Sequence, residues 1–205
     1  LKTFNISTTA SFVIAAAGGH IAKHGNRSVS GVSGSADIFE YFGFNLDSEP
    51  VKITNMIEEI GIGFMFAPVF HPAMRFAADP RREIGIRTVF NILGPLTNPA
   101  APRSQVLGVA RPELGETMAL VLDRLGCERA FVVHGGGGAD ELTLSSGNQI
   151  WELKHHKVET FTLSPGDVGL EVQQPGVIKG GDADTNRSLM EAVLGGEPGP
   201  LSEAV

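Results

Sequence analysis

Residues 106–110 (VLGVA), 112–125 (PELGETMALVLDRL) and 130–133 (AFVV) decide the fold of this chain. The first and third are short apolar runs, as expected of buried strands, and the second is predicted to be a helix. A strand, a helix and a second strand in this order make a βαβ unit, which implies parallel strands. The sequence therefore predicts an α/β fold with a central, mostly parallel sheet flanked by helices.

The rest of the chain adds elements of both kinds. Residues 62–68 (IGFMFAP) are another short apolar run that predicts a buried strand. Residues 149–153 and 157–163 alternate as antiparallel strands do, and they predict a β-hairpin extension around a solvated His155-His156 turn. Helices are predicted over residues 5–17, 35–42, 50–60, 87–93 and 182–194.

The composition limits the class of protein. The chain has 205 residues, of which 42% are hydrophobic, enough for one sizeable core and one α/β domain over residues 1–205. A net charge of -7 argues against nucleic acid or an anionic membrane as the main partner. Cys127 is the single cysteine, so we expect no disulfide framework and a cytoplasmic location.

Both ends of the sequence are typical of a chain that has been truncated. Leu1 is not an initiator methionine, and residues 201–205 (LSEAV) are typical of the first turn of a helix that then stops. We therefore expect the chain to be an excerpt of a longer protein.

A glycine–serine loop occupies residues 23–35 (KHGNRSVSGVSGS). Its glycines let backbone N–H groups approach an anion, and Lys23 and Arg27 add positive charge. The loop leads into a predicted helix, whose N-terminus also favours anions. The pattern indicates a phosphate site, with an ordinary surface loop as an equal alternative.

An acid turn occupies residues 135–141 (GGGGADE) and follows the strand at 130–133. The four glycines match neither the Rossmann nor the P-loop spacing. Asp140 and Glu141 offer hard oxygen ligands of the kind that suits Mg²⁺, and the glycines permit the irregular backbone that two adjacent ligands need. On the pattern alone, two solvated acids on a turn are the favoured alternative.

Two further segments follow the strand at 62–68, near the edge where open α/β sheets place their ligands. Residues 71–75 (HPAMR) and 80–83 (PRRE) are predicted to be helix starts or turns. On the pattern alone a structural role for His71 ranks above a catalytic one.

Six motifs carry a resemblance to a known family. They are residues 3–8 (TFNIST), 23–27 (KHGNR), 34–37 (GSAD), 71–74 (HPAM), 87–96 (RTVFNILGPL) and 140–141 (DE). In this order and spacing they resemble anthranilate phosphoribosyltransferase over nearly the whole chain.

The resemblance implies an enzyme, a pentosyltransferase with a nucleoside phosphorylase/phosphoribosyltransferase-like fold. It would transfer phosphoribosyl from phosphoribosyl pyrophosphate to anthranilate, giving phosphoribosyl-anthranilate and pyrophosphate in tryptophan biosynthesis. It also implies small-molecule substrates, no nucleic acid or membrane partner, and a homodimer of the full-length protein.

The same resemblance implies roles for individual residues. Ser7, Asp140 and Glu141 match the Mg²⁺ ligands, and Asn26, His71 and Arg81 match positions around anthranilate. The implied catalytic residues are Lys23, Asn26, His71 and Arg81. The positions implied for phosphoribosyl pyrophosphate are Thr3, Asn5, Ile6, Ser7, Thr8, Lys23, His24, Gly25, Asn26, Arg27, Ser28, Val29, Ser30, Gly31 and Ser35.

One departure from the family concerns what this sequence lacks. The family has a Gly-Thr-Gly-Gly-Asp loop before the position of Leu1, preceded by a small helical domain, and it has further C-terminal helices. The one catalytic domain at residues 1–205 is therefore expected to be inactive by itself.

Two rival functions share the architecture. A pyrimidine nucleoside phosphorylase uses inorganic phosphate and does not need the paired acids for Mg²⁺. A non-catalytic relative that binds nucleic acid would need a basic groove, which a net charge of -7 disfavours.

Overall fold

The computed structural model describes residues 3–28, 33–86, 88–145 and 147–205, without the side chain of Arg82. The chain divides into two compact units: unit 1 comprises Leu1–Ala10 and Ala101–Val205, and unit 2 comprises Ser11–Ala100. Helix α1 (Ile6–Ala16) begins in unit 1 and ends in unit 2. That residues 1–205 act as one catalytic domain stays a prediction. No helix in the described ranges is both long and apolar enough to span a bilayer.

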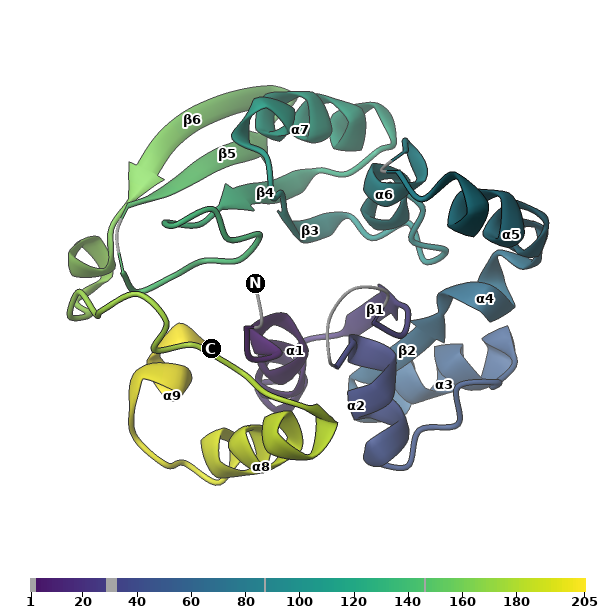
Figure 1. Cartoon of the computed structure of the whole chain (residues 1–205), viewed down its shortest axis with the longest axis horizontal. Helices are drawn as coiled ribbons and strands as arrows, with labels where there is room; N and C mark the ends of the chain where they lie inside the picture. The colour runs from purple at the N-terminus through teal and green to yellow at the C-terminus, as the bar shows by residue number, and fades with distance from the viewer. Residues whose placement is uncertain (1–2, 29–32, 87, 146) are drawn as a thin grey trace. The chain divides into compact units, whose positions relative to one another are not determined.

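Unit 1 is built on the predicted βαβ unit. Strand β3 (Ser104–Gly108), helix α7 (Gly115–Arg124) and strand β4 (Arg129–His134) follow one another, and β3 and β4 are parallel. Strands β5 (Asn148–Lys154) and β6 (Lys157–Leu163) form the predicted antiparallel hairpin and complete a sheet of order β3-β4-β5-β6 (Figure 1).

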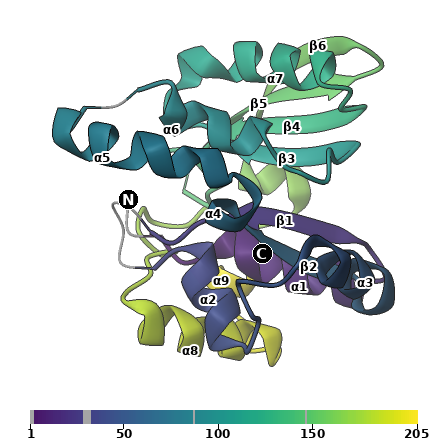
Figure 2. The same ribbon diagram turned by 90° about the vertical axis from the view of Figure 1, so that its right-hand side faces the viewer.

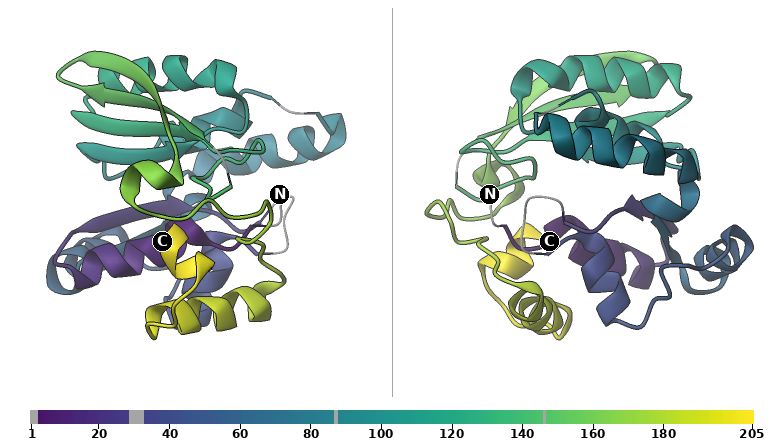
Figure 3. Two further views of the ribbon diagram at one scale, coloured as in Figure 1. Left: turned by 90° about the vertical axis from the view of Figure 1, so that its left-hand side faces the viewer. Right: turned by 45° about the vertical axis from the view of Figure 1, so that its right-hand side comes forward.

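Helix α7 covers one face of this sheet (Figures 2 and 3). Its buried residues include Met118, Ala119 and Leu122, which are spaced as one apolar helix face. Gly115 begins the helix against Trp151 of β5, where a Cβ would lie 2.3 Å from the indole ring. Only a glycine lets the helix start this close to the sheet.

The N-terminal segment of unit 1 is packed against the C-terminal part of the chain. The Phe4 side chain is fully buried, and its N–H donates to the carbonyl of Ile178 at 2.9 Å. The remaining helical elements of the unit are η3 (Pro112–Leu114), η4 (Pro165–Val168), α8 (Ala183–Leu194) and α9 (Pro200–Ala204). Asp182 caps α8 by accepting from the N–H of Thr185, as the sequence predicts.

Unit 2 contains a parallel pair, β1 (Ile21–Gly25) and β2 (Ile62–Phe66). Its core includes stacked rings of Phe39 and Phe64, whose centroids are 4.5 Å apart. The other helical elements are α2 (Ser35–Tyr41), α3 (Pro50–Ile60), α4 (Ala67–Phe70), η1 (Pro72–Met74), α5 (Arg75–Ile84), α6 (Phe90–Leu93) and η2 (Gly94–Leu96).

The α/β class is confirmed, and two details differ from the expectation. The described strands lie in two sheets, with the parallel pairs β1-β2 and β3-β4 divided between them. The helix start expected at Pro80 is wrong, because α5 begins at Arg75 and carries Pro80 in its interior. The proline at that position lacks an N–H, so the helix passes through with one backbone hydrogen bond fewer.

Candidate functional site

The glycine–serine loop leaves the C-terminal end of β1, whose last residue is Gly25. A Cβ at Gly25 would lie 3.2 Å from the ring of Phe64 and 3.5 Å from the Cβ of Ser35. The loop therefore starts where the strand, the aromatic core and the first residue of α2 meet. Lys23 lies opposite Phe64 in the strand register, two residues before the loop leaves the sheet.

The two ends of this loop are tied together by Asp37. Its Oδ2 accepts from the N–H of Gly34 at 2.8 Å and from the N–H of Ser28 at 3.5 Å. A Cβ at Gly34 would lie 2.5 Å from the nitrogen of Ser28, so the crossing requires glycine. The predicted positions Val29, Ser30 and Gly31 lie outside the described residues.

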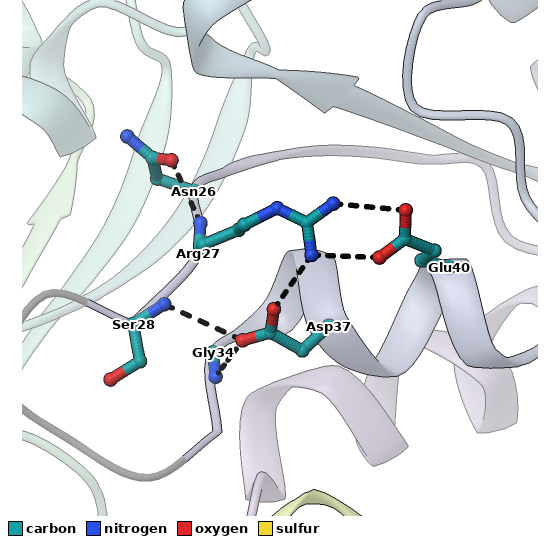
Figure 4. A network of polar contacts seen from close by, with 6 residues as sticks. All are labelled: Asn26, Arg27, Ser28, Gly34, Asp37 and Glu40. Atoms are coloured by element: carbon teal, nitrogen blue, oxygen red, sulfur yellow. Dashed lines mark hydrogen bonds and ion pairs between the residues drawn. The ribbon is translucent and has the colours of Figure 1, made fainter.

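The guanidinium of Arg27 binds two carboxylates (Figure 4). Its Nη1 lies 3.0 Å from Oδ1 of Asp37 and 2.7 Å from Oε2 of Glu40, and its Nη2 donates to Oε1 of Glu40 at 2.9 Å. These bonds raise the pKa of Arg27, and Arg27 lowers the pKa of Glu40. The positive charge of Arg27 is thus paired with two carboxylates of the protein, which the sequence analysis did not foresee. Its contact with phosphoribosyl pyrophosphate stays a prediction.

Asp37 and Glu40 carried a usable signal in the sequence. Asp37 is the third residue of α2, where an acidic side chain can accept from the backbone N–H of the residue before the helix. Glu40 comes three positions later and so lies on the same side of the helix.

His24 and His71, both implied by the resemblance, meet in unit 2. Their Nε2 atoms are 3.1 Å apart, and the rings are nearly perpendicular with centroids 5.0 Å apart. Burial lowers the pKa of His24, and the neighbouring His71 lowers it further, while the backbone carbonyl of Gly94 raises it in part. The uncharged form of His24 is therefore favoured, and the two Nε2 atoms lie within hydrogen-bond distance, with the donor set by the tautomers of the rings.

Asn26 and Arg81 occupy different surroundings in the same unit. The Oδ1 of Asn26 accepts from the N–H of Arg27 at 2.8 Å. The guanidinium of Arg81 lies over the ring of Phe90, 5.3 Å from its centroid. A guanidinium held over an aromatic ring keeps its planar fork of donors for a planar acid group.

The site residues predicted at the start of α1 differ in how exposed they are to solvent. Ser7 in the first helical turn is exposed, whereas Thr8 is 1% exposed and Ile6 is 7% exposed. The Oδ1 of Asn5 accepts from Nδ2 of Asn186 at 2.9 Å, which joins the start of α1 to α8. In this structure Ser7 offers the most accessible side chain of the group.

The acid turn leaves β4 through a tight glycine crossing. Gly135 pairs with Ala139, and Gly137 and Gly138 have φ values of 80° and 84°. A Cβ at Gly135 would lie 1.9 Å from the carbonyl oxygen of Glu141. Asp140 is exposed, whereas Glu141 is partly buried and its Oε2 is buried. The backbone that carries both acids is irregular, as predicted.

The donor chemistry of Ser7, Asp140 and Glu141 fits Mg²⁺. All three carry hard oxygen ligands, and all belong to unit 1. Across the described ranges, no three His, Cys, Asp or Glu side chains form a group able to hold a metal ion. Mg²⁺ does not need such a group, because it commonly keeps several waters and binds through one or two carboxylates and substrate phosphates.

A cavity of about 250 Å³ in unit 1 lies beside the glycines of the acid turn. Its lining includes Thr3, Gly136, Gly137, Ser145 and Lys179. Thr3 and Lys179 form an antiparallel bridge, so one predicted site residue and one amine lie together at its wall. The sequence analysis did not single out Lys179, which has no motif around it.

The chain is similar in sequence to anthranilate phosphoribosyltransferases of several organisms. An anthranilate phosphoribosyltransferase of Trichlorobacter lovleyi is 55% identical over 204 residues, which are 100% of this chain and 58% of that protein. The anthranilate phosphoribosyltransferase of Acetivibrio thermocellus is 50% identical over 100% of this chain and 59% of its own length. The chain thus spans less than two thirds of these relatives.

Solved structures agree with the sequences. The anthranilate phosphoribosyltransferase of Thermus thermophilus matches with a TM-score of 0.92 and 47% identity, over 100% of this chain and 60% of that one. The enzyme of Saccharomyces cerevisiae in complex with PRPP and Mg matches with a TM-score of 0.87 and 29% identity, over 99% and 58%. The model of the glycosyl transferase family, a/b domain, matches residues 1–205, and the chain therefore belongs to this family.

Proposed function

We propose that the full-length protein transfers the phosphoribosyl group of phosphoribosyl pyrophosphate to anthranilate, releasing pyrophosphate. The observation that carries the proposal is identity of 50–55% over the whole chain with anthranilate phosphoribosyltransferases. The glycine–serine loop would supply groups that bind phosphate, and the acid turn would supply oxygen ligands for Mg²⁺. The reaction would belong to tryptophan biosynthesis in the cytoplasm.

The proposed roles follow from the charges that develop in the reaction. Breaking the bond between ribose C1 and pyrophosphate leaves negative charge on the pyrophosphate and positive charge on the sugar. Lys23 and backbone N–H groups of the loop would bind the phosphate oxygens, together with Thr3, Asn5 and Ser35. One well-placed donor to developing charge typically contributes about 10²–10³ in rate.

Asp140, Glu141 and Ser7 would hold Mg²⁺. When bound, the ion would offset the negative charge of the leaving pyrophosphate. The exposed Asp140 and the glycine-supported backbone of the turn favour this role, because they leave room for the waters that Mg²⁺ retains.

Anthranilate would be held through its carboxylate. Arg81 has the bidentate fork that a carboxylate requires, and it lies over Phe90. Asn26 and His71 would complete the acceptor site. The amine of anthranilate is already a nucleophile, so positioning accounts for most of the remaining work.

The test is an assay of the full-length protein with anthranilate and phosphoribosyl pyrophosphate, with and without Mg²⁺. The proposal expects pyrophosphate release that requires both substrates and Mg²⁺. Phosphorolysis of a pyrimidine nucleoside by inorganic phosphate, with no pyrophosphate release in the first assay, would contradict it. Sedimentation of the same protein tests the proposed homodimer.

A further inference from the structure

Asn148, the first residue of β5, bonds to the backbone on both sides of the two acids. Its side chain is buried, with 3% of the residue exposed. The Oδ1 accepts from the N–H of Thr143 at 2.8 Å and from the N–H of Gly136 at 3.4 Å. Gly136 precedes the two acids and Thr143 follows them, so one amide spans the segment that carries both carboxylates.

The nitrogen of the same amide also makes two hydrogen bonds. The Nδ2 of Asn148 donates to the carbonyl of Thr143 at 3.0 Å and to the carbonyl of Leu163 at 3.1 Å. Two N–H groups face one end of the amide and two carbonyls face the other, which fixes its orientation. A buried amide with every hydrogen bond made is a rigid connection between the turn and the β5-β6 hairpin.

Two glycines lie in close contact with the backbone of the acids. A Cβ at Gly108 would lie 1.6 Å from the carbonyl oxygen of Asp140, and a Cβ at Gly135 would lie 1.9 Å from that of Glu141. The backbone of Asp140 thus lies against the last residue of β3, and that of Glu141 lies against the residue that follows β4. Together with Asn148, these contacts restrain the turn at three places.

We propose that Asn148 is a positioning residue that sets the geometry of Asp140 and Glu141 toward a divalent cation. The proposal rests on the proposed function, since it presupposes that the two acids hold Mg²⁺. Mg²⁺ requires near-ideal octahedral geometry, so a small change in the backbone of the acids weakens binding. Loss of an outer contact that orients metal ligands typically costs about 10–100-fold in metal affinity.

The plain alternative is that Asn148 only stabilises the hairpin. Two variants and one control separate the two roles. Asn148→Asp keeps the size of the side chain but cannot donate to the carbonyls of Thr143 and Leu163, and Asn148→Ser is a milder change. The control Ile150→Ala removes a buried side chain two residues along the same strand, 2% exposed and outside these bonds.

The experiment uses the full-length protein and two measurements. The first is the Mg²⁺ concentration for half-maximal pyrophosphate release at saturating substrates. The second is binding of Mn²⁺, a spectroscopic substitute, titrated by electron paramagnetic resonance in the presence of phosphoribosyl pyrophosphate. Melting temperatures are recorded for every variant, so that metal affinity is compared with stability.

We expect both metal midpoints to rise about tenfold or more in Asn148→Asp and by a smaller factor in Asn148→Ser. Ile150→Ala should lower the melting temperature and leave both midpoints within twofold of wild type. Unchanged midpoints in both Asn148 variants would overturn the inference, and Asn148→Ser decides if Asn148→Asp does not fold. A wild-type protein that releases no pyrophosphate would overturn the proposed function itself.

Discussion

The glycine–serine loop of unit 2 and the acid turn of unit 1 are both rich in glycine, yet they are held by different forces. In the loop, Asp37 and Glu40 bind Arg27 at the surface, where the side chains of Arg27 and Glu40 are 47% and 52% exposed. In the turn, a buried amide and two backbone contacts at glycines hold the chain.

The difference predicts different sensitivities for the two regions. Exposed ion pairs are screened by salt and contribute little to stability, so the loop can change its contacts at low cost. The loss of a single atom from a buried hydrogen bond or a close backbone contact lowers the stability of the folded state. Under the proposed function, the loop that would admit an anionic substrate has the first kind of restraint, and the turn that would hold a small cation has the second.

The largest expected effect comes from Gly108→Ala in the turn region. The added Cβ would lie 1.6 Å from the carbonyl oxygen of Asp140, which is backbone and cannot rotate away. We expect a loss of about 3 kcal/mol in the free energy of unfolding, measured by urea denaturation. Gly166→Ala is the control, because a Cβ there meets nothing within 4 Å. Equal stability of the two variants would show that the turn is not packed as described.

A smaller effect is expected from Asp37→Ala in the loop. The change removes the acceptor for the N–H of Gly34 at the start of α2, as well as one partner of Arg27. Loss of a helix-capping contact costs about 1 kcal/mol, measured by the same urea method. A cost matching that of Gly108→Ala would contradict the contrast between the two regions.

The pH dependence of the free energy of unfolding should report the lowered pKa of His24. Because burial lowers the pKa of His24 in the folded state, the unfolded chain binds more protons below about pH 6.5. Stability should therefore fall as the pH drops below 6.5, the usual value for histidine, and His24→Gln should flatten this fall. His20→Gln, at an exposed position, is the matched control. The same slope in wild type and His24→Gln would refute the assignment.

The smallest effect is expected from Glu40→Gln. Arg27 keeps its bond to Asp37 in this variant, and the lost partner is exposed. The destabilisation should be slight at low salt and should vanish near 1 M NaCl, where the Debye length is about 3 Å. Destabilisation that persists at high salt would mean that Arg27 and Glu40 are less accessible to solvent than the structure shows.

The sequence predicts an element well where proline or glycine marks its start or its end. The helix expected at 50–60 matches α3 (Pro50–Ile60), because Pro50 opens it and Gly61, at φ 79°, ends it. Strand β1 was missed, since Ile21–Gly25 carries Lys and His among few apolar residues. Its strand character depends on pairing with β2, which lies about forty residues further along the chain.

The candidate site is predicted in part. Asp140 and Glu141 stand out beside their glycines, whereas the approach of His71 to His24 was predicted neither by the pattern nor by the resemblance. Asn148 carries no local signal, because its role depends on contacts with Gly136, Thr143 and Leu163 that only the folded hairpin creates. Long-range hydrogen bonds of this kind are invisible to periodicity and spacing.

The central claim is that Asp140 and Glu141 act on a metal ion and not on protons. Its most direct test is the Mg²⁺ dependence of pyrophosphate release by the full-length protein, compared among wild type, Asp140→Asn and Glu141→Gln. The account predicts a sharply lower rate and a higher Mg²⁺ concentration at half-maximal rate in both variants. An unchanged Mg²⁺ dependence in both would contradict it.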